Sequence, residues 1–228
     1  MSRLSKGVKV LRRVGGFLMI LGFAGWFGAF VLAGFGVTGL VPSHIELPLG
    51  VIDNIAVDDA GRVYCAAGPY ARVQVYSAEG KFIRGIHSRS RGGGITYIEI
   101  DPEGLLHVAT ARNRWHYVFD RQGRLLSRVQ DEKYYDRLSE DKADAYDKAG
   151  DRYKVSPSVF WPRVLRIDPS GNAQTVVSTP ILLWFIMMPL PAWLFALIGM
   201  VLIDLPDRLA RGRKPGRRMN IYAGGTSS

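Results

Sequence analysis

Two long runs of apolar, uncharged residues stand near the ends of the chain, at residues 15–41 and 180–203. As a helix, the first run would be about 40 Å long, which exceeds the roughly 30 Å hydrocarbon core of a bilayer. The second run contains Pro189 and Pro191, which predict a kink that a membrane helix tolerates. The pattern therefore predicts two transmembrane helices. A cleaved signal peptide is the competing interpretation of the first run, but such peptides have apolar runs of only roughly 7–15 residues.

Short alternating apolar runs fill the region between these helices and form an internal repeat. Residues 52–86 align without a gap on residues 95–129, and a third, degenerate copy stands near residues 144–178. Within each copy, pairs of apolar runs are joined by Asp-x-x-Gly or Ser-x-x-Gly corners, in which the polar side chain accepts backbone hydrogen bonds and Gly takes the positive φ of a hairpin turn. The corners stand at 58–61, 77–80, 101–104, 120–123, 147–150 and 168–171. This spacing predicts an all-β domain of about three four-stranded sheets, with a helical insertion over the acidic, Ala-rich residues 131–149.

Two of these corners carry a longer signature, Val57-Asp58-Asp59-Ala60-Gly61-Arg62-Val63-Tyr64 and Ile100-Asp101-Pro102-Glu103-Gly104-Leu105-Leu106-His107. The pattern resembles the NHL repeat of β-propellers, whose blades are four-stranded and about 40 residues long. The resemblance implies an incomplete propeller, because closed propellers have typically four to eight blades. Open sheet edges recruit partners, so we expect a protein partner or a second copy of the chain. The alternative is a small open β-domain whose edges are covered by residues 131–149 and by the membrane helices.

The distribution of charge assigns a topology to the two predicted helices. The chain has 30 Lys and Arg against 20 Asp and Glu, a net charge of +10. Residues 1–14 carry +5 and residues 204–228 carry +4, whereas residues 42–179 carry only +1. Positive flanks remain in the cytoplasm. We therefore expect a plasma (inner) membrane protein with cytoplasmic basic ends and a periplasmic or extracellular domain over residues 42–179, and we expect the lipid bilayer, not nucleic acid, to be the partner of the basic ends.

Candidate catalytic chemistry is sparse. Cys65 is the single cysteine, which excludes an internal disulfide, and its apolar strand position predicts a buried, inert thiol. The four histidines lack metal-ligand spacing, and His107 and His116 align with Tyr64 and Val73 of the first repeat, which indicates structural positions. The sequence has no nucleophile or phosphate-loop motif. We therefore assign no catalytic, cofactor-binding or metal-binding residue and expect no cofactor.

Two sets of residues are candidates for contacts with other molecules. Arg89 and Arg91 flank a glycine loop, and Arg112, Arg114 and Trp115 lie at a predicted blade loop, where they are candidates for contact with anionic lipid headgroups or an acidic partner. The alternative for these basic residues is solvation and internal pairing with the acidic segment. In the first apolar run, a stripe of small residues at helical spacing predicts close packing on the second helix. The stripe consists of Ala24, Gly25, Gly28, Ala29 and Ala33.

These observations favour a membrane-anchored extracytoplasmic binding or scaffold module, an accessory or assembly subunit of a larger membrane complex. One alternative is a propeller-type hydrolase or lyase with a metal-dependent site, which the resemblance to propeller families implies. Another is a ligand sensor coupled to a cytoplasmic partner through the basic tail. The domain boundaries that follow are 1–14, 15–41, 42–179, 180–203 and 204–228.

Overall fold

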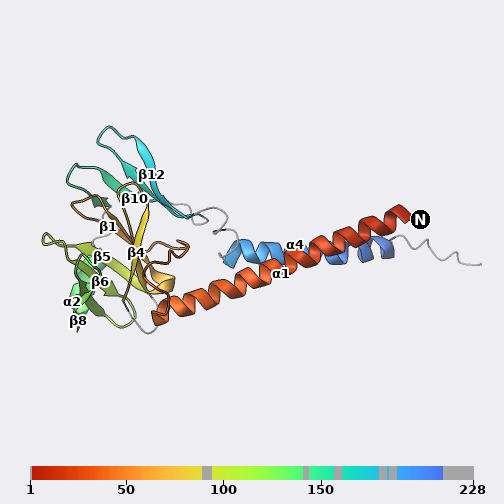
Figure 1. The fold of residues 1–228 in the computed structure, drawn as a ribbon, viewed down its shortest axis with the longest axis horizontal. Helices are drawn as coiled ribbons and strands as arrows, with labels where there is room; N and C mark the ends of the chain where they lie inside the picture. Colours follow the sequence, from red (N-terminus) through yellow and green to blue (C-terminus); the bar gives the residue numbers. More distant parts are fainter. Residues whose placement is uncertain are drawn as a thin grey trace, which may run out of the picture.

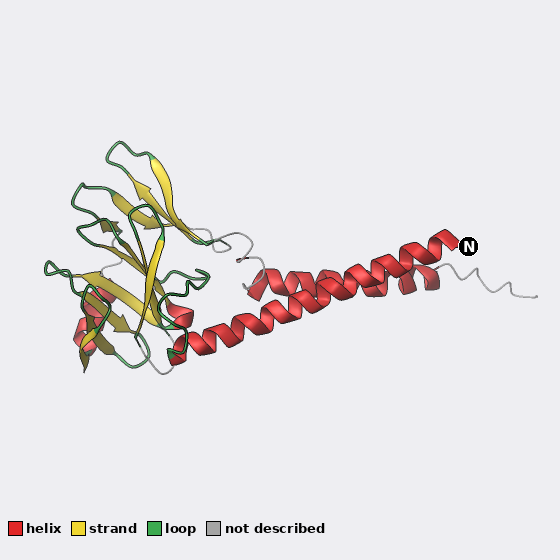
Figure 2. Cartoon of the chain, in the orientation of Figure 1, coloured by secondary structure: helices red, strands yellow, loops and turns green. Residues whose placement is uncertain are grey.

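A pair of long helices projects from an all-β domain (Figure 1). The computed structural model describes residues 2–88, 94–140, 144–156, 161–179, 184 and 189–212. Helix α1 spans Ser2–Thr38 and helix α4 spans Pro189–Gly212. The two helices lie side by side, and all strands belong to the domain at the far end of α1 (Figure 2).

Twelve strands form three separate four-stranded antiparallel sheets, as the repeat predicted. Each sheet is a meander in which neighbours in sequence are neighbours in space. The first sheet contains β1 (Asn54–Val57), β2 (Val63–Ala67), β3 (Arg72–Tyr76) and β4 (Phe82–His87); the second contains β5 (Ile95–Ile100), β6 (Leu106–Thr110), β7 (Trp115–Phe119) and β8 (Leu125–Gln130); the third contains β9 (Ala145–Tyr146), β10 (Arg152–Val155), β11 (Arg163–Ile167) and β12 (Ala173–Ser178). Three meanders of this kind resemble the blades of a propeller.

All six predicted corners form hairpin turns. At each corner the glycine has a φ between 73° and 87°. Its N–H donates to the carbonyl of the Asp or Ser three residues earlier, at 2.8 to 3.1 Å. A residue with a Cβ pays a steric penalty at such a φ, so glycine is the residue that the turn requires.

The insertion at residues 131–149 is only partly helical, and the sequence interpretation overextended it. Helix α2 spans Glu132–Glu140, and strand β9 and a corner follow it. The Asp147 carboxylate accepts hydrogen bonds from the N–H groups of Ala149 and Asp151, at 2.9 and 3.0 Å. This turn starts a hairpin in which Tyr146 pairs with Arg152, so the last part of the segment belongs to the third sheet.

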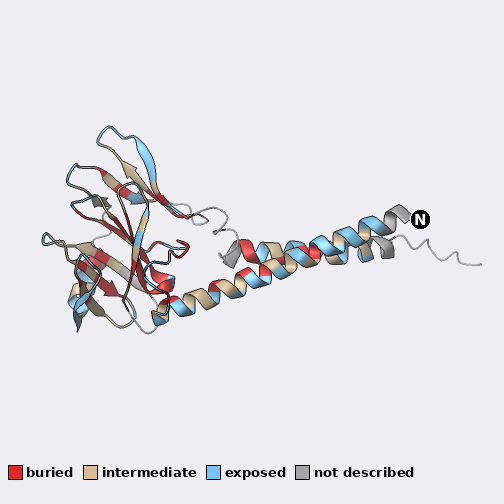
Figure 3. Ribbon diagram, viewed as in Figure 1, coloured by how far each residue is buried: buried red, intermediate tan, exposed pale blue. Residues whose placement is uncertain are grey.

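The first sheet lies between the other two. One of its faces packs on Ile98, Leu106, Val108, Tyr117 and Phe119 of the second sheet, and the opposite face packs on Tyr153, Val164 and Val177 of the third. Its central strands β2 and β3 are buried along their whole length (Figure 3). The second and third sheets thus pack on opposite faces of the first.

Helix α2 covers the face of the second sheet that points away from the first, where a further blade would pack. It contacts β5, β6 and β7. On these strands Glu99, His107 and His116 alternate with the core residues Ile98, Val108 and Tyr117, so they lie on the face that α2 covers. Helix α2 therefore covers the outer face of the second sheet at strands β5, β6 and β7.

Helix α1 is the one helix within the described residues that is long and apolar enough to cross a membrane. The segment Lys6–Thr38 has 33 residues and contains an 18-residue window with a mean hydropathy of 2.0. The helix ends three residues before the predicted 41, because Gly39 has a φ of 73° and donates to Gly36 O, while Leu40 N donates to Phe35 O. This pair of bonds is a Schellman motif, which closes the C-terminus of a helix.

The kink predicted at Pro189 and Pro191 stays a prediction, because it depends on residues 185–188, which the structure does not describe. Both prolines occupy the first turn of α4. Proline is tolerated there because the first N–H groups of a helix have no intrahelical acceptor. Residues 180–183 and 185–188 of the predicted second span lie outside the described residues.

Small residues bring α1 and α4 into close contact, although not all at the predicted positions. A Cβ at Gly22 would overlap the backbone of Ala192 and Ala196, and one at Gly15 or Gly199 would overlap the opposite helix. Of the predicted stripe, Gly25 and Ala29 are buried and Ala33 packs against the β-domain core. Ala24 is exposed, and a Cβ at Gly28 would meet nothing within 4 Å, because both lie on other faces of the helix.

The segment that joins α1 to the first sheet is held by side chains of one face of β3. The Gln74 amide donates to Leu47 O and accepts from Leu47 N, both at 2.8 Å. The fully buried Arg72 donates from Nη2 to three carbonyls, those of Pro42, Ser43 and Ile45, at 2.6 to 3.2 Å. Burial lowers the pKa of Arg72 to about 10, which still leaves it charged at neutral pH. The linker is thus an integral part of the domain.

Candidate functional site

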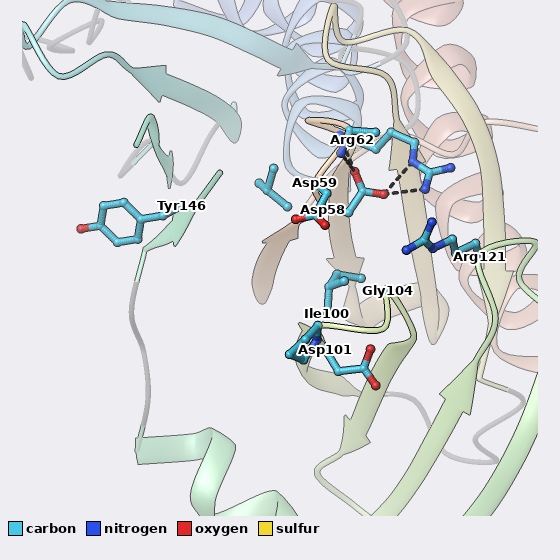
Figure 4. Close-up of a pocket in the computed structure, with 11 residues that line it drawn as sticks. Asp58, Asp59, Arg62, Ile100, Asp101, Gly104, Arg121 and Tyr146 are labelled. Atoms are coloured by element: carbon cyan, nitrogen blue, oxygen red, sulfur yellow. Dashed lines mark hydrogen bonds and ion pairs between the residues drawn. The ribbon is translucent and has the colours of Figure 1, made fainter. Parts of the chain in front are cut away.

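The inner strands of the three sheets line a groove, which we call the central groove. It consists of two adjoining hollows of about 340 and about 190 Å³, which share Val57, Ile100 and Tyr146. The larger hollow lies at the corners of the first two sheets (Figure 4). The smaller follows β1 and β5 and is bounded by Leu138 of α2 and Ala145 of β9.

The carboxylate of Asp58, at the larger hollow, is committed to the turn that it begins. Its Oδ1 accepts hydrogen bonds from the N–H groups of Ala60 and Arg62, both at 3.0 Å. Its Oδ2 accepts from Arg62 Nε at 2.7 Å and from the Tyr64 hydroxyl at 3.2 Å. Asp58 is only 8% exposed, so this carboxylate stabilises the corner and is not free to act on a ligand.

The same arrangement recurs in all three sheets. The sixth residue after the aspartate of the first corner in a sheet donates back to the Oδ2 of that aspartate: Tyr64 to Asp58, and Tyr153 to Asp147 at 3.1 Å. In the second sheet that position is His107, whose Nε2 lies 2.9 Å from Asp101 Oδ2. The contact between the corner aspartate and the side chain six residues later therefore occurs in all three sheets. The alignment of His107 with Tyr64 in the internal repeat had placed these two residues at equivalent positions.

The remaining charges at the groove are mostly paired. Asp59 forms an ion pair of 2.6 Å with Lys148, which connects the corner at 58–61 of the first sheet to the corner at 147–150 of the third sheet. The Arg121 guanidinium donates to Glu103 O at 3.1 Å. Among the described residues no group of three or more His, Cys, Asp or Glu side chains could hold a metal ion. The groove offers polar rims and strand edges, which suit binding of an extended or polar ligand.

A polar cluster lies beneath α2, and the sequence interpretation missed it. His107 Nδ1 lies 2.9 Å from His116 Nε2, which extends the contact with Asp101 into a chain of three side chains. The His116 ring stacks on Tyr134 of α2, with 3.7 Å between centroids and 12° between planes. We call Asp101, His107, His116, Tyr134, Glu99 and Arg137 the histidine cluster.

The outer part of the histidine cluster connects α2 to β5. The Tyr134 hydroxyl donates to Glu99, and Arg137 Nη2 forms an ion pair of 2.9 Å with the same carboxylate. Burial, and then the neighbouring His107, lower the pKa of His116 below its ordinary value. Burial alone would raise the pKa of Asp101, but the hydrogen bonds from His107 and Leu105 outweigh it and hold that pKa low.

The predicted basic surface is largely engaged within the chain. Arg89 and Arg91 lie outside the described residues. The Arg114 guanidinium stacks on Tyr135 at 3.7 Å and lies 3.5 Å from Asp136, both on α2. Trp115 is half-buried under Arg128, whose guanidinium lies 3.9 Å from the ring centroid. Arg112 lies in the same loop and has an interaction of its own. Contact of these residues with lipid or an acidic partner stays a prediction.

Cys65 is completely buried on β2. Burial raises the pKa of its thiol far above the ordinary value. A thiol in that environment is protonated and inaccessible, so it is neither a nucleophile nor a metal ligand.

No family model matches the sequence, and no curated protein matches it. Among solved structures, the chain is similar to a catalytically inactive virginiamycin B lyase from Staphylococcus aureus with quinupristin, at 12% identity and a TM-score of 0.35, over 58% of this chain and 43% of that chain. A streptogramin B lyase gives 8% identity and a TM-score of 0.35, over 59% and 43%. A protein of unknown function from Bacteroides caccae gives 19% and 0.31, over 55% and 45%. The chain spans less than half the length of these structures. The NHL resemblance remains a hypothesis.

Proposed function

We propose that this protein is a membrane-anchored binding module, in which α1 and α4 form a transmembrane hairpin and the β-domain presents its central groove to a protein partner outside the cytoplasm. The observation that carries the proposal is the fixed junction between α1 and the first sheet. Because Arg72 and Gln74 bind the linker carbonyls, the domain has one orientation relative to the helices. In a flexible tether, the linker carbonyls would form hydrogen bonds with water and not with Arg72 and Gln74.

The antiparallel contact of α1 and α4 supports the topology. Gly15 lies against Gly199, near the N-terminus of α1, and Arg12 forms an ion pair of 2.6 Å with Asp207. The N-terminus of α1 and the C-terminus of α4 are therefore at the same end of the hairpin (Figure 1). Under the positive-inside rule that end is cytoplasmic.

The groove opens at the end of the domain that is distant from the helices. Strand β2 runs from the corner at Asp58 to the short 3₁₀ helix η1 (Gly68–Tyr70). The last turn of α1 packs on η1, where a Cβ at Gly36 would overlap Tyr70. The corner and the larger hollow thus lie at the opposite end of β2 from α1, which suits a site that receives a partner from the aqueous side.

A second surface that fits a protein partner is the outer strand of the second sheet. All six residues of β8 are exposed, and Leu125, Leu126 and Val129 are 50%, 57% and 47% exposed. An edge strand with apolar side chains is a template for strand addition. Completion of a ring is less favoured, because α2 covers the second sheet and the outer face of the third carries Arg152 and Lys154, which alternate with the buried Tyr153.

Cysteine labelling tests the topology. In a Cys65→Ala background, Ser170→Cys at the tip of the third sheet and Lys9→Cys on α1 each give one exposed thiol. With a membrane-impermeant maleimide on intact cells, we expect labelling at 170 and none at 9 until the cells are lysed. Labelling at 9 in intact cells, or none at 170, contradicts the topology.

Site-specific photo-crosslinking tests the binding surface. A photoreactive residue at Tyr146 reports on the groove, one at Leu126 reports on the β8 edge, and one at Ser170 is the control. We expect a discrete higher-mass adduct in membranes from Tyr146 or Leu126 and none from Ser170. The absence of an adduct at both positions, in cells that express the protein from its own locus, contradicts the proposal.

A further inference from the structure

The contact between α2 and the second sheet is built on two histidines whose hydrogen bond depends on their protonation. Neutral imidazole has one N–H donor and one acceptor nitrogen, and imidazolium has two donors and no acceptor. The nitrogens His107 Nδ1 and His116 Nε2 lie 2.9 Å apart, so one must donate and the other accept. His107 Nε2 also faces the Asp101 carboxylate at 2.9 Å.

The pair accommodates one added proton but not two. With both rings neutral, His107 donates to Asp101 and accepts from His116. With one added proton, His107 donates both to Asp101 and to His116. A second proton places two N–H groups against each other at hydrogen-bonding distance and brings two positive rings together. Two interacting groups of this kind titrate as a coupled pair.

We propose that the histidine cluster is a pH-sensitive latch, which holds α2 on the second sheet when at most one of His107 and His116 is protonated and releases the helix when both are. The release acts on α2 because Tyr134 stacks on His116. It acts on the groove because Leu138 of α2 forms part of the groove wall and β9 follows α2 in the chain.

The other charged groups around the pair act in opposite directions. Glu99 on β5 and Asp131 at the start of α2 favour the protonated form of His116, and Arg137 on α2 and His107 oppose it. Burial also opposes it and is the largest cause of the lowered pKa of His116. A histidine with a lowered folded-state pKa contributes stability above the unfolded-state value of about 6.5, and this stability is lost as the pH falls below that value.

Two further contacts of α2 lie outside the histidine pair and give a baseline for the helix. Arg114 contacts Tyr135 and Asp136, and the Asp131 carboxylate accepts from Tyr134 N at 2.9 Å as the N-cap of the helix. Histidine is the side chain whose ordinary pKa lies between pH 5 and pH 8, so the histidine pair is the part of this interface on which the latch depends.

Hydrogen exchange of the full-length protein in detergent tests the latch. Protection of the amides of residues 132–140, corrected for the pH dependence of intrinsic exchange, is measured from pH 8 to pH 5. We expect protection to fall about tenfold or more, while strand β2 stays protected. His116→Gln cannot take up the second proton, so we expect its α2 protection to be independent of pH. The exposed His44→Gln is the matched control and should behave as the wild type.

Equal protection of α2 at pH 8 and pH 5 in the wild type overturns the proposal. So does a full pH response in the His116→Gln variant. If that variant lacks α2 protection even at pH 8, His107→Gln replaces it, because it keeps the stack of His116 on Tyr134 and also removes the second charge. A full pH response in His107→Gln then overturns the latch.

Discussion

The side-chain amide of Gln74 binds both backbone polar groups of Leu47, 27 residues away in the chain, with two hydrogen bonds of 2.8 Å. Gln74 is completely buried, as is Leu47 at 2% exposure. This pairing imitates one step of a strand ladder, and it fixes the path of the chain between α1 and the first sheet. A substitution at Gln74 is therefore expected to affect both the domain and its junction with the helices.

Gln74→Ala should destabilise the whole domain. It leaves a buried N–H and a buried carbonyl of Leu47 without partners, and each such group costs about 1–3 kcal/mol. The measurement is the midpoint of denaturant unfolding in detergent. Gln122→Ala, at an exposed turn, is the control and should leave the midpoint unchanged. Equal midpoints for the two variants would show that the linker is not bound as described.

Gly22→Ala should separate the helix pair, because the added Cβ overlaps the backbone of Ala192 and Ala196. Cross-linking of Arg12→Cys to Asp207→Cys by a short bifunctional maleimide reports on the hairpin, because the native side chains form an ion pair. We expect this cross-link to be lost or much slower with Gly22→Ala. Gly28→Ala, where a Cβ meets nothing within 4 Å, should cross-link normally. Efficient cross-linking in both would contradict the helix contact.

Asp58→Ala should cost more stability than Asp168→Ala, although both begin a corner. Asp58 is buried and serves Arg62 and Tyr64 as well as its own turn. Its removal leaves a guanidinium and a hydroxyl without their acceptor, at a cost of about 2–4 kcal/mol. The Asp168 side chain binds only within its own turn, to Asn172 and to the backbone N–H groups of Ser170 and Gly171. Thermal unfolding of the two variants is the comparison, and an equal loss in both would contradict the role of Asp58.

Cys65 should be unreactive in the folded protein. Its side chain has 0% exposure, and burial keeps the thiol protonated. We expect no modification by a thiol reagent at pH 8 in detergent and complete modification after denaturation. Stoichiometric modification without denaturant would show that the first sheet opens readily.

The turns and strands were predictable because they depend on local rules. An Asp or Ser followed three residues later by Gly specifies a hairpin through contacts within five residues, and all six such corners formed. The extent of α2 was not predictable in this way. Residues 145 and 146 join a strand only because Arg152 and Tyr153 pair with them, which is a tertiary effect on a two-residue element.

The histidine cluster and the contact between α1 and α4 were also only partly predictable from the sequence. His107 and His116 lie on two neighbouring strands, so their closeness was available from the sequence. A helix was predicted in residues 131–149, but its position over the two histidines was not. In α1, small residues occur on several faces, and only the position of α4 distinguishes Gly22 from Gly28. Spacing alone predicted that small residues of α1 pack closely on the second helix, but it placed some of these residues on the wrong face of α1.

The β-domain begins and ends at one place. Leu49 N donates to Thr179 Oγ1 at 2.8 Å, and the same hydroxyl donates to Leu49 O at 3.3 Å, although 130 positions separate the two residues. The third sheet makes this closure by packing on the first. A domain whose entry and exit coincide can be inserted into a helical hairpin, or exchanged for another, without moving either helix. In engineering terms, the hairpin is an acceptor site, and the unit to transplant is residues 42–179, which include the linker that Arg72 and Gln74 bind.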